Sequence, residues 1–429
     1  MKENHIWYPC TQMKEIDLNP LPNIKKAKGS WLIDKNNNKY LDAISSWWVN
    51  LFGHNNPEIK KAINKQLNKF EHIIFSNFTH DPAIKFTDEL VKVLPKGLEK
   101  VLFSSDGSSA VEMALKLSFQ YHKQINNKQK NKFISITNSY HGETIGALSV
   151  GNIDIFTKTY KPLIKQNITI QGPECTNCIY KKNRLNCNAE CFENIEKEVQ
   201  KNHKKISAII IEPMVQCAAG MKIYNKTYLK KIRDICNQYN INLIADEIAV
   251  GFGRTGKMFA CEHANISPDI ITLSKGITGG FLPLSVTVCT KKIYDAFYDD
   301  YEKNKSFLHS HSYSGNPIAC TAALETLKIF KNQQILNKIN QKSLYMQKQI
   351  EQNLNNIPKL KEYRHIGLIH VIEINNKNPR FNYEIHKKAL KKGLLIRPIG
   401  NNIYFMPPYT IKNEEIDFII HISSEILKK

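Results

Sequence analysis

The sequence has no long hydrophobic run and little arginine, and each shortage excludes a class of protein. No apolar stretch approaches the ~18 residues that a membrane-spanning helix needs. The first residues, "MKENHIWYPC", lack the apolar core of a secretory signal peptide, so we expect a cytoplasmic protein without membrane association. The ten cysteines form no compact disulfide framework, which agrees with a reducing compartment.

The scarcity of arginine bears on the chain's strong positive charge. A formal net charge of +21 is typical of nucleic-acid-binding proteins. However, only six of the 60 basic residues are Arg, the residue that base readout and phosphate clamps favour. The lysines are also spread over the whole chain instead of forming one stripe. We therefore expect a solvated, lysine-rich surface and no nucleic-acid partner.

Short apolar segments alternate with amphipathic stretches, which is typical of an α/β protein. With 429 residues, of which 42% are hydrophobic, the chain can form a large domain and a smaller one. The predicted strands of the first are 100–105, 132–137, 207–213, 242–247, 269–274 and 282–289. Residues 108–122 have the apolar spacing of a helix that directly follows a strand. Helical stretches at about 320–355 precede two further predicted strands, "IHVIEI" and "IYFMPP".

Residues 251–256, "GFGRTG", match the G-x-G-x-x-G pattern of dinucleotide-binding loops, but their surroundings do not. Such a loop must open a long helix, and the next strand must end in an acidic residue. Here Pro268 stops the following segment, and the next strand ends in Ser274 and Lys275. We therefore exclude a dinucleotide site of the Rossmann type.

Two predicted strands end in side chains of opposite charge, Asp246 and Lys275. Ligands bind at the carboxyl ends of the strands in an open α/β sheet, so both are candidate site residues. An arbitrary Asp and Lys would form a simple ion pair, but the glycines of "SKGITGG" leave room for a cofactor beside the amine. A partly buried lysine can form a Schiff base, and a neighbouring aspartate can hold a protonated pyridine nitrogen.

A third feature is the start of the predicted helix in "SSDGSSAVEMALKL", where Gly107, Ser108 and Ser109 follow a strand directly. Free N–H groups, hydroxyls and the helix dipole make an anion site there. Taken alone, this pattern would indicate ordinary N-capping. Together with the lysine and the aspartate it predicts the 5′-phosphate seat of pyridoxal phosphate, and Tyr140 is suited to stack on the cofactor ring.

The residues around Lys275 closely resemble a known family. Residues 246–280, "DEIAVGFGRTGKMFACEHANISPDIITLSKGITGG", are similar to the lysine-site block of the class III aminotransferases. Further segments resemble the subgroup of that family that acts in biotin synthesis: "HIWYPCTQM", "YLDAISSWWVNLFGHNNPEI", "SSDGSSAVEMALKLSFQYH", "SYHGETIGALSVG", "EPMVQCAAGM" and "LIRPIGNNIYFMPPY". The resemblance runs essentially from end to end.

The resemblance implies an α/β fold, that of the fold type I pyridoxal-phosphate-dependent transferases. A large cofactor-binding domain, residues 60–320, would contain a mostly parallel sheet of the seven-stranded type. Within it, residues of about 172–192 would form a Cys-rich insertion. A smaller α+β domain would combine the two chain ends, residues 1–59 and 321–429.

The resemblance also implies how pyridoxal 5′-phosphate is bound. Lys275 would be the catalytic residue, joined covalently to the cofactor and later moving a proton between the substrate and the ring. Asp246 would hold the pyridine nitrogen, and Tyr140 would stack on the ring. In a homodimer with active sites at the subunit interface, His311 and Ser312 would reach the phosphate from the second subunit. The implied cofactor-binding residues are Gly107, Ser108, Tyr140, Asp246, Lys275, His311 and Ser312.

The substrate-binding residues implied in the same way are Trp47, Trp48, Tyr140, Arg254, Ser310 and Arg397. Arg397 would bind the carboxylate of a long keto acid through its bidentate guanidinium, which a lysine could not copy. Trp47 and Trp48 are neighbours, so their side chains must face different surroundings, and at least one would line the methylene chain. The glycine turns of "GFGRTG" would hold Arg254 toward the site.

The implied reaction transfers an amino group to 8-amino-7-oxononanoate and gives 7,8-diaminononanoate. S-adenosylmethionine is the expected donor and L-lysine the alternative. Cys10 stands where relatives that use adenosylmethionine have an aromatic residue that stacks on the adenine, and a cysteine cannot do so. Transamination of an ω-amine such as ornithine or 4-aminobutyrate is a further alternative. The last alternative is a protein of a different class, a nucleic-acid-binding protein with a metal cluster.

Four cysteines form a separate pattern, C-x2-C-x8-C-x3-C, at Cys175, Cys178, Cys187 and Cys191. Four thiolates at this spacing could hold zinc or an iron–sulfur cluster. The alternative is a surface insertion whose reduced thiols happen to lie close together. In either case we expect no metal in the catalytic site, because the amine chemistry belongs to the pyridoxal cofactor.

Overall fold

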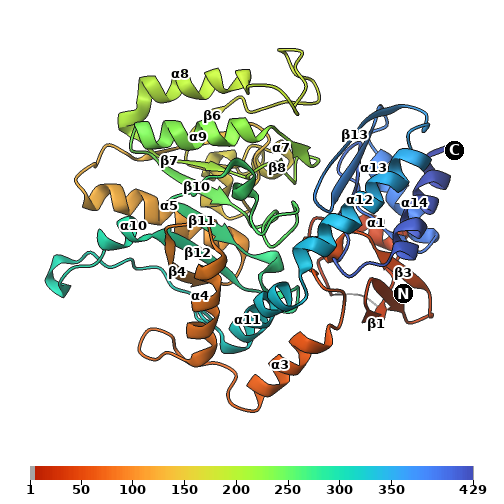
Figure 1. Cartoon of the computed structure of the whole chain (residues 1–429), viewed down its shortest axis with the longest axis horizontal. Coiled ribbons are helices and arrows are strands. Elements are labelled where there is room, and N and C mark those ends of the chain that lie inside the picture. Colours follow the sequence, from red (N-terminus) through yellow and green to blue (C-terminus); the bar gives the residue numbers. More distant parts are fainter. Residues whose placement is uncertain (1–4, 429) are drawn as a thin grey trace.

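A seven-stranded sheet forms the centre of the computed structural model, which describes residues 5–428 (Figure 1). Its strands in spatial order are β4 (Leu98–Ser104), β12 (Ser285–Thr290), β11 (Ile270–Leu273), β10 (Asn242–Asp246), β7 (Ile206–Ile211), β5 (Lys132–Ile136) and β6 (Ile168–Ile170). Strand β12 is antiparallel to both of its neighbours, and the other neighbouring pairs are parallel. The prediction of an α/β fold with a mostly parallel sheet is confirmed.

Both faces of this sheet are covered, which explains why its central strands are mostly apolar. The covering helices are α5 (Gly107–Gln124) on one face and α8 (Glu193–Asn202) and α9 (Lys226–Gln238) on the other. In β7, Ala208 and Ile210 share a core cluster with residues of α5. The alternate residues Ile209 and Ile211 pack in the cluster that contains α8 and α9. Successive side chains thus serve opposite layers.

A second part of the molecule combines segments from the two ends of the chain (Figure 1). One of its sheets joins β1 (Ile24–Lys28), β2 (Trp31–Asp34) and β3 (Lys39–Asp42) to β15 (Leu394–Leu395). Another contains β13 (Leu360–Ile366), β14 (Ile369–Ile374) and β16 (Asn402–Phe405). A separate core cluster joins these strands to α12 (Ile335–Asn353), α13 (Phe381–Lys391) and α14 (Asn413–Lys428).

Two helices connect the two parts, α3 (Pro57–Leu67) and α11 (Pro317–Asn332), and α4 (Asp81–Val93) follows α3. Helix α11 packs against α3, against α4 and against the short helix η5 (Lys275–Thr278). The predicted domain boundaries, near residues 59 and 320, fall inside α3 and α11. A domain boundary normally falls in a linker and not inside a helix. We therefore propose that α3 and α11 both belong to the larger part.

The remaining elements are short. They are α1 (Met13–Leu18), α2 (Ser45–Trp48), α6 (Ile145–Leu148), α7 (Asp154–Thr157), η1 (Lys161–Leu163), η2 (Glu190–Phe192), η3 (His203–Lys205), β8 (Val215–Gln216), β9 (Lys222–Ile223), η4 (Ala260–Ala264), α10 (Lys291–Asp295) and η6 (Tyr301–Lys303). Within residues 5–428, no helix combines the length and the apolar character needed to cross a membrane.

The turn α2 has an unusual backbone. Its residues Ser45, Ser46, Trp47 and Trp48 have φ angles of 51°, 46°, 68° and 74°. Side chains with a Cβ atom disfavour this left-handed region by ~1–2 kcal/mol per residue. A run of this kind persists only where the surrounding structure holds it, and such strain is concentrated at functional sites.

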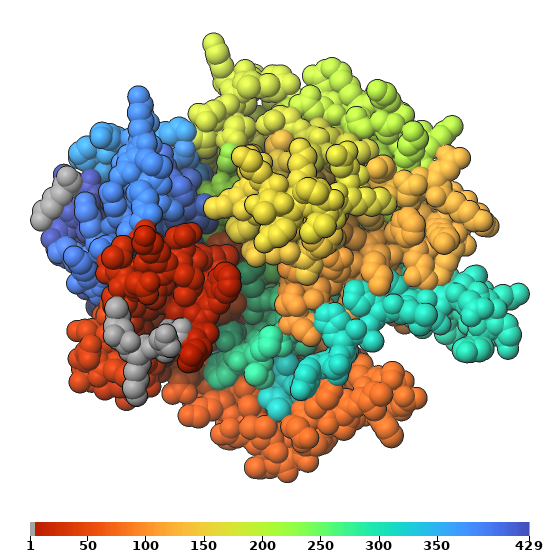
Figure 2. All heavy atoms as spheres, turned by 180° about the vertical axis from the view of Figure 1, so that it is seen from behind, coloured from red at the N-terminus to blue at the C-terminus, as the bar shows by residue number. Residues whose placement is uncertain are grey.

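An arm of the chain projects from the body of the molecule near residue 300 (Figure 2). Tyr301 and Leu308 on this segment are 90% and 86% exposed. Tyr298 and Tyr313 are also exposed. Large apolar side chains of this kind, gathered on one segment, mark an interaction surface.

Candidate active site

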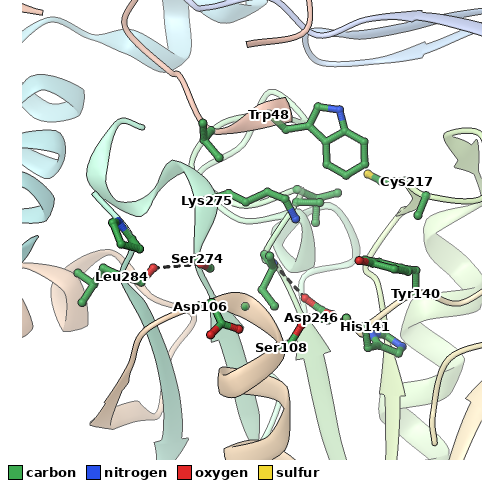
Figure 3. Close-up of a pocket in the computed structure, with 18 of the residues that line it drawn as sticks. Trp48, Asp106, Ser108, Tyr140, His141, Cys217, Asp246, Ser274, Lys275 and Leu284 are labelled. Carbon is green, nitrogen blue, oxygen red and sulfur yellow. Dashed lines mark hydrogen bonds and ion pairs between the residues drawn. The ribbon is translucent and has the colours of Figure 1, made fainter. Parts of the chain in front are cut away.

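A cavity of about 470 Å³ opens at the carboxyl ends of the sheet strands (Figure 3). The chain supplies its lining just after β4, β5, β7, β10 and β11. Ligands of open α/β sheets bind at this edge. The structure thus brings together six of the predicted residues, which lie far apart in the sequence: Trp48, Gly107, Ser108, Tyr140, Asp246 and Lys275.

Lys275 projects into this cavity from the first position of η5. Its backbone has a φ of 45°, and its Nζ lies 5.2 Å from the centre of the Trp48 ring. Burial lowers the pKa of the Lys275 amine, and the nearby Asp246 carboxylate opposes that shift. A lowered pKa makes the neutral, nucleophilic amine more abundant at neutral pH.

Asp246, the last residue of β10, is held by a histidine that we did not predict. His141 Nδ1 lies 2.7 Å from Asp246 Oδ2 in a buried pair, and the Ile248 amide donates to Asp246 Oδ1 at 3.1 Å. The imidazole therefore fixes the orientation of the carboxylate. The only signal in the sequence is its place beside Tyr140 after a predicted strand.

A second buried carboxyl group, that of Glu212, also lines the cavity. Its oxygens accept hydrogen bonds from the Tyr140 amide at 3.1 Å and the Cys217 amide at 3.0 Å. Burial raises the pKa of Glu212 to about 7. We did not predict a role for Glu212, although it ends the apolar run that predicts β7.

The amino-terminal turn of α5 also lines the cavity. Asp106 caps this helix, and its carboxylate accepts the Ser109 amide at 3.0 Å. The amides of Gly107 and Ser108 have no carbonyl partner within the helix, because they belong to its first turn. Gly142 packs directly on Ser108: a Cβ atom there would lie 2.1 Å from Ser108 Oγ. The site thus combines free N–H groups with the positive end of a helix dipole.

Tyr140 lies over the side of the cavity that faces Asp246 (Figure 3). Its hydroxyl donates to Glu143 Oε1 at 2.9 Å, and its ring centre is 5.1 Å from that of Phe156. Burial and the Glu143 carboxylate raise the pKa of the Tyr140 hydroxyl, so that it remains protonated. The contact with Phe156 and the hydrogen bond to Glu143 therefore both hold the Tyr140 ring in place.

The left-handed turn sends the two neighbouring indoles to different surroundings. Trp48 is 5% exposed, lines the cavity and donates its Nε1–H to the Tyr404 hydroxyl at 3.1 Å. Trp47 is 40% exposed and lies outside the lining, where the Arg397 guanidinium is 4.3 Å from its ring centre. Arg397 also donates to the Cys10 carbonyl at 3.4 Å. Neither Trp47 nor Arg397 lines the cavity that contains Trp48.

Arg254 lies outside the cavity lining, and its predicted role in substrate binding stays a prediction. Arg254 is 1% exposed and is absent from the cavity lining. Its guanidinium donates to the main-chain carbonyls of Trp48, Asn50, Met406 and Pro407. The surrounding glycines turn the chain inward, and the guanidinium donates its hydrogen bonds to main-chain carbonyls instead of facing the cavity.

Ser310, His311 and Ser312 also lie outside the cavity lining of their own chain. His311 Nδ1 is 3.1 Å from the Ser105 hydroxyl, and the carbonyl of Ser312 contacts His72 Nε2 at 2.7 Å. Ser310 and Ser312 are exposed. Their predicted roles, which involve a second subunit, stay predictions.

The four clustered cysteines line a separate cavity of about 110 Å³. Burial raises the pKa of Cys175 to about 12 and that of Cys191 to about 11. In the part of the chain that the structure describes, no three or more His, Cys, Asp or Glu side chains are grouped to hold a metal ion.

Comparisons with known proteins agree with this geometry. The family model for class III aminotransferases matches residues 13–427. The adenosylmethionine-8-amino-7-oxononanoate aminotransferase of Helicobacter pylori is 42% identical over 428 residues, which are 99% of this chain and 96% of that protein. The enzyme of the same name from Buchnera aphidicola is 37% identical over 99% of this chain and 96% of its own length.

Solved structures give the same result. The adenosylmethionine-8-amino-7-oxononanoate aminotransferase from Methanocaldococcus jannaschii superimposes with a TM-score of 0.93 at 35% identity, over 99% of this chain and 97% of that one. A PLP-bound amine transaminase from an uncultivated Pseudomonas species has a TM-score of 0.92 at 27% identity, over 99% and 98% of the two chains. The chain therefore belongs to the class III aminotransferases, a family of pyridoxal-phosphate-dependent transferases.

Proposed function

We propose that this enzyme transfers an amino group to 8-amino-7-oxononanoate and forms 7,8-diaminononanoate, a step of biotin synthesis. The observation that carries the proposal is the near full-length similarity to relatives named for this reaction, at 42% and 37% identity. The geometry supports it, because Lys275 lies against Trp48 and Arg397 lies against the adjacent Trp47. An amine and a guanidinium beside neighbouring indoles suit a substrate with a reacting carbonyl at one place and a carboxylate at another.

The residues of the cavity fit pyridoxal phosphate. An amine, a buried carboxylate and a helix amino terminus lie around one space of about 470 Å³, and they match the aldehyde, the ring nitrogen and the phosphate of the cofactor. The close packing of Gly142 on Ser108 keeps side chains away from the helix end. When bound, the cofactor serves as an electron sink for the carbon that bears the transferred nitrogen.

Each protein group then has a definite task. Lys275 Nζ, whose pKa burial lowers, binds the cofactor aldehyde and later carries a proton on the same nitrogen. Asp246 balances the positive charge of a protonated ring nitrogen, and His141 holds the carboxylate in place at 2.7 Å. Tyr140 bounds the cavity with its flat ring and excludes water.

We assign substrate recognition to Arg397, Trp47 and Trp48. The planar guanidinium of Arg397 is held 4.3 Å from the Trp47 ring centre, and its fork fits a carboxylate. The indole of Trp48 provides an apolar surface between that fork and Lys275, along which methylene groups can lie.

We propose S-adenosylmethionine as the amino donor, as the names of the relatives indicate. Cys10 lies beside Arg397 and cannot stack on an adenine. L-lysine is therefore the alternative donor, and an ω-amine such as ornithine or 4-aminobutyrate is the second alternative.

We further propose that the enzyme is a cytoplasmic homodimer. The exposed apolar residues of the arm near residue 300, including Tyr301 and Leu308, support a second copy as the partner. The same arm leads to His311 and Ser312, which this arrangement would place at the partner's phosphate site. The ten free cysteines agree with a reducing compartment. Sedimentation of the purified enzyme measures its oligomeric state, and a monomer at micromolar concentration would refute the dimer.

A donor assay tests the proposed reaction. The purified enzyme with pyridoxal phosphate is mixed with 8-amino-7-oxononanoate and, separately, S-adenosylmethionine, L-lysine, ornithine or 4-aminobutyrate. Mass spectrometry then measures 7,8-diaminononanoate. We expect the product with S-adenosylmethionine. Product with lysine alone would change the donor, and no product with any of these donors would overturn the proposed reaction.

A further inference from the structure

Arg364, on strand β13 of the smaller part, is a buried cation whose hydrogen bonds reach both parts of the molecule. It is 2% exposed, and each of its five N–H groups has an acceptor. The acceptors are the carbonyls of Gly220 at 2.7 Å and Met221 at 3.0 Å, the carboxylates of Glu362 at 3.0 Å and Glu373 at 2.7 Å, and the side-chain oxygen of Asn402 at 2.7 Å. The two carbonyls belong to the larger part and the other three acceptors to the smaller part, so this guanidinium joins the two.

Two carboxylates balance the charge of Arg364. Burial opposes the ionisation of Glu362, but Arg184 and Arg364 hold the pKa of Glu362 below its ordinary value. Burial acts on Glu373 in the same way, and there Lys361 and Arg364 hold the pKa below its ordinary value. Both side chains are therefore negatively charged at neutral pH, and the guanidinium is fixed by charge-assisted hydrogen bonds.

The two carbonyls that Arg364 holds lie in the turn between β8 and β9, which forms part of the active-site wall. Cys217, at the start of this turn, lines the cavity that contains Lys275 (Figure 3). The amides of Gly220 and Met221 donate to the Cys217 carbonyl at 3.2 Å and 3.0 Å. Gly220 has a φ of 92°, and a Cβ atom there would lie 2.5 Å from Asn402 Nδ2. The turn is therefore packed directly against the first residue of β16.

Asn402 connects the same guanidinium to the segment that carries Arg397. Its Nδ2 donates to the Ile399 carbonyl at 3.3 Å, and the main chains of Ile399 and Asn402 exchange two hydrogen bonds of 2.9 Å. Arg397 lies only two residues before Ile399. A shift of Asn402 relative to the larger part would therefore move the guanidinium that we assign to the substrate carboxylate.

We infer that Arg364 is a positioning residue: its guanidinium attaches the β8–β9 turn of the larger part to β16 of the smaller part and so sets the separation of Lys275 and Arg397. Arg364 lies outside the cavity lining and acts through the turn and Asn402. The attachment stands on the contacts alone, whereas its effect on the substrate rests on the proposed function.

Hydrogen exchange in the holoenzyme tests the attachment. Arg364→Lys keeps the positive charge, but its single ammonium group pairs with the carboxylates and cannot also hold both carbonyls of the turn. The amides of residues 217–221 should then exchange roughly tenfold faster, because the turn loses two hydrogen bonds from a charged donor. Mass spectrometry of the digested protein measures this rate, and a peptide from β11 should exchange as in the wild type.

Lys361→Gln is the matched control. Lys361 is also a cation of β13, and its Nζ pairs with the Glu373 carboxylate at 2.7 Å. This variant removes a charge from the same strand and from the same carboxylate but leaves the contacts of Arg364 with the turn. Exchange in residues 217–221 should therefore stay at the wild-type rate.

Steady-state kinetics tests the effect on the substrate. In Arg364→Lys the KM for 8-amino-7-oxononanoate should rise about tenfold and kcat should fall less, because a displacement of ~1 Å caused by a distant mutation can cost up to about a hundredfold. Lys361→Gln should keep both constants. If Arg364→Lys does not fold, Asn402→Ala breaks the attachment on the β16 side and should raise the same KM.

Each outcome bears on a different step. Wild-type exchange in residues 217–221 of folded Arg364→Lys would overturn the attachment. Faster exchange with an unchanged KM would overturn the role in placing Arg397, as would an unchanged KM in Asn402→Ala. Faster exchange together with no product from the wild type would retain the attachment and reject the proposed reaction.

Discussion

Trp47 and Trp48 show how a single turn can place two identical neighbouring side chains in different surroundings. The left-handed backbone places one indole in the cavity beside Lys275 and the other against Arg397. In a strand the two would have pointed to opposite faces of a sheet, and in a helix they would have diverged by about 100°. The turn instead buries Trp48 in the cavity and leaves Trp47 half exposed beside Arg397.

A test at the residue scale concerns Arg397. Replacing it with alanine should raise the KM for 8-amino-7-oxononanoate by the value of a charge-assisted hydrogen bond, about 1.5–3 kcal/mol, or roughly 10- to 150-fold. The kcat should change much less, because Arg397 does not line the cavity that holds Lys275. Steady-state kinetics measures both constants. Arg397→Lys is the matched control, which keeps the charge and loses the fork, and an unchanged KM in Arg397→Ala would remove this residue from the site.

The sequence predicts the residues of this site unevenly. Asp246 and Lys275 are predictable, because each ends an apolar strand beside residues of distinctive type. His141 and Glu212 are not, since their importance comes from a 2.7 Å contact and from burial, which exist only in the folded chain. The surroundings of Arg254 are not predictable either, because glycine turns indicate a bend and do not give its direction.

At the scale of elements, the central strands are predictable because burial on both faces leaves long apolar runs. The three-residue strand β6 is too short to give a pattern, and β1, with the sequence "IKKAK", is largely exposed and lysine-rich. The turn α2 could not be predicted, because "SSWW" contains no Gly or Asn to indicate positive φ angles. Its conformation is imposed by tertiary contacts.

Helix α11 provides a test at the element scale, because it supports the turn that carries Lys275. Asn316 caps this helix: its Oδ1 accepts the amides of Ile318 at 3.1 Å and Ala319 at 3.0 Å. Asn316→Ala should lower the free energy of unfolding by about 1 kcal/mol. Urea titration measures the loss. Asn316→Asp keeps the accepting oxygen and should lose less, and equal losses in the two variants would show that the cap is not the cause.

At the scale of the whole molecule, both ends of the chain meet in the smaller part, and helices α3 and α11 link it to the large sheet (Figure 1). The active-site cavity takes its floor from the large sheet and part of its wall from the amino-terminal turn α2. The net charge of +21 is not needed to form the site. Contacts between distant chain segments therefore decide the shape of the site.

The pH dependence of stability is a property of the whole molecule. Burial, with a contribution from Lys130, lowers the pKa of His122 to about 4 from its ordinary value of 6.5. The native state therefore resists protonation of His122 where the unfolded state accepts it. This contribution is present above pH 6.5 and is lost as the pH falls from 6.5 toward about 4.

His122→Gln tests this effect, since glutamine can keep the donation to the Ser207 carbonyl that His122 Nε2 makes at 2.9 Å. Thermal unfolding between about pH 7 and pH 5 should show a smaller loss of stability in the variant than in the wild type. Equal losses would mean that other groups account for the acid sensitivity.

The most direct measurement is product formation by wild-type enzyme and Lys275→Ala, prepared side by side with pyridoxal phosphate. Both are given 8-amino-7-oxononanoate and S-adenosylmethionine, and 7,8-diaminononanoate is quantified. Because the Lys275 amine is needed both to bind the cofactor covalently and to carry the proton, we expect product from the wild type and none above background from the variant. Product from Lys275→Ala at a rate near that of the wild type would contradict the assignment of Lys275 as the catalytic residue.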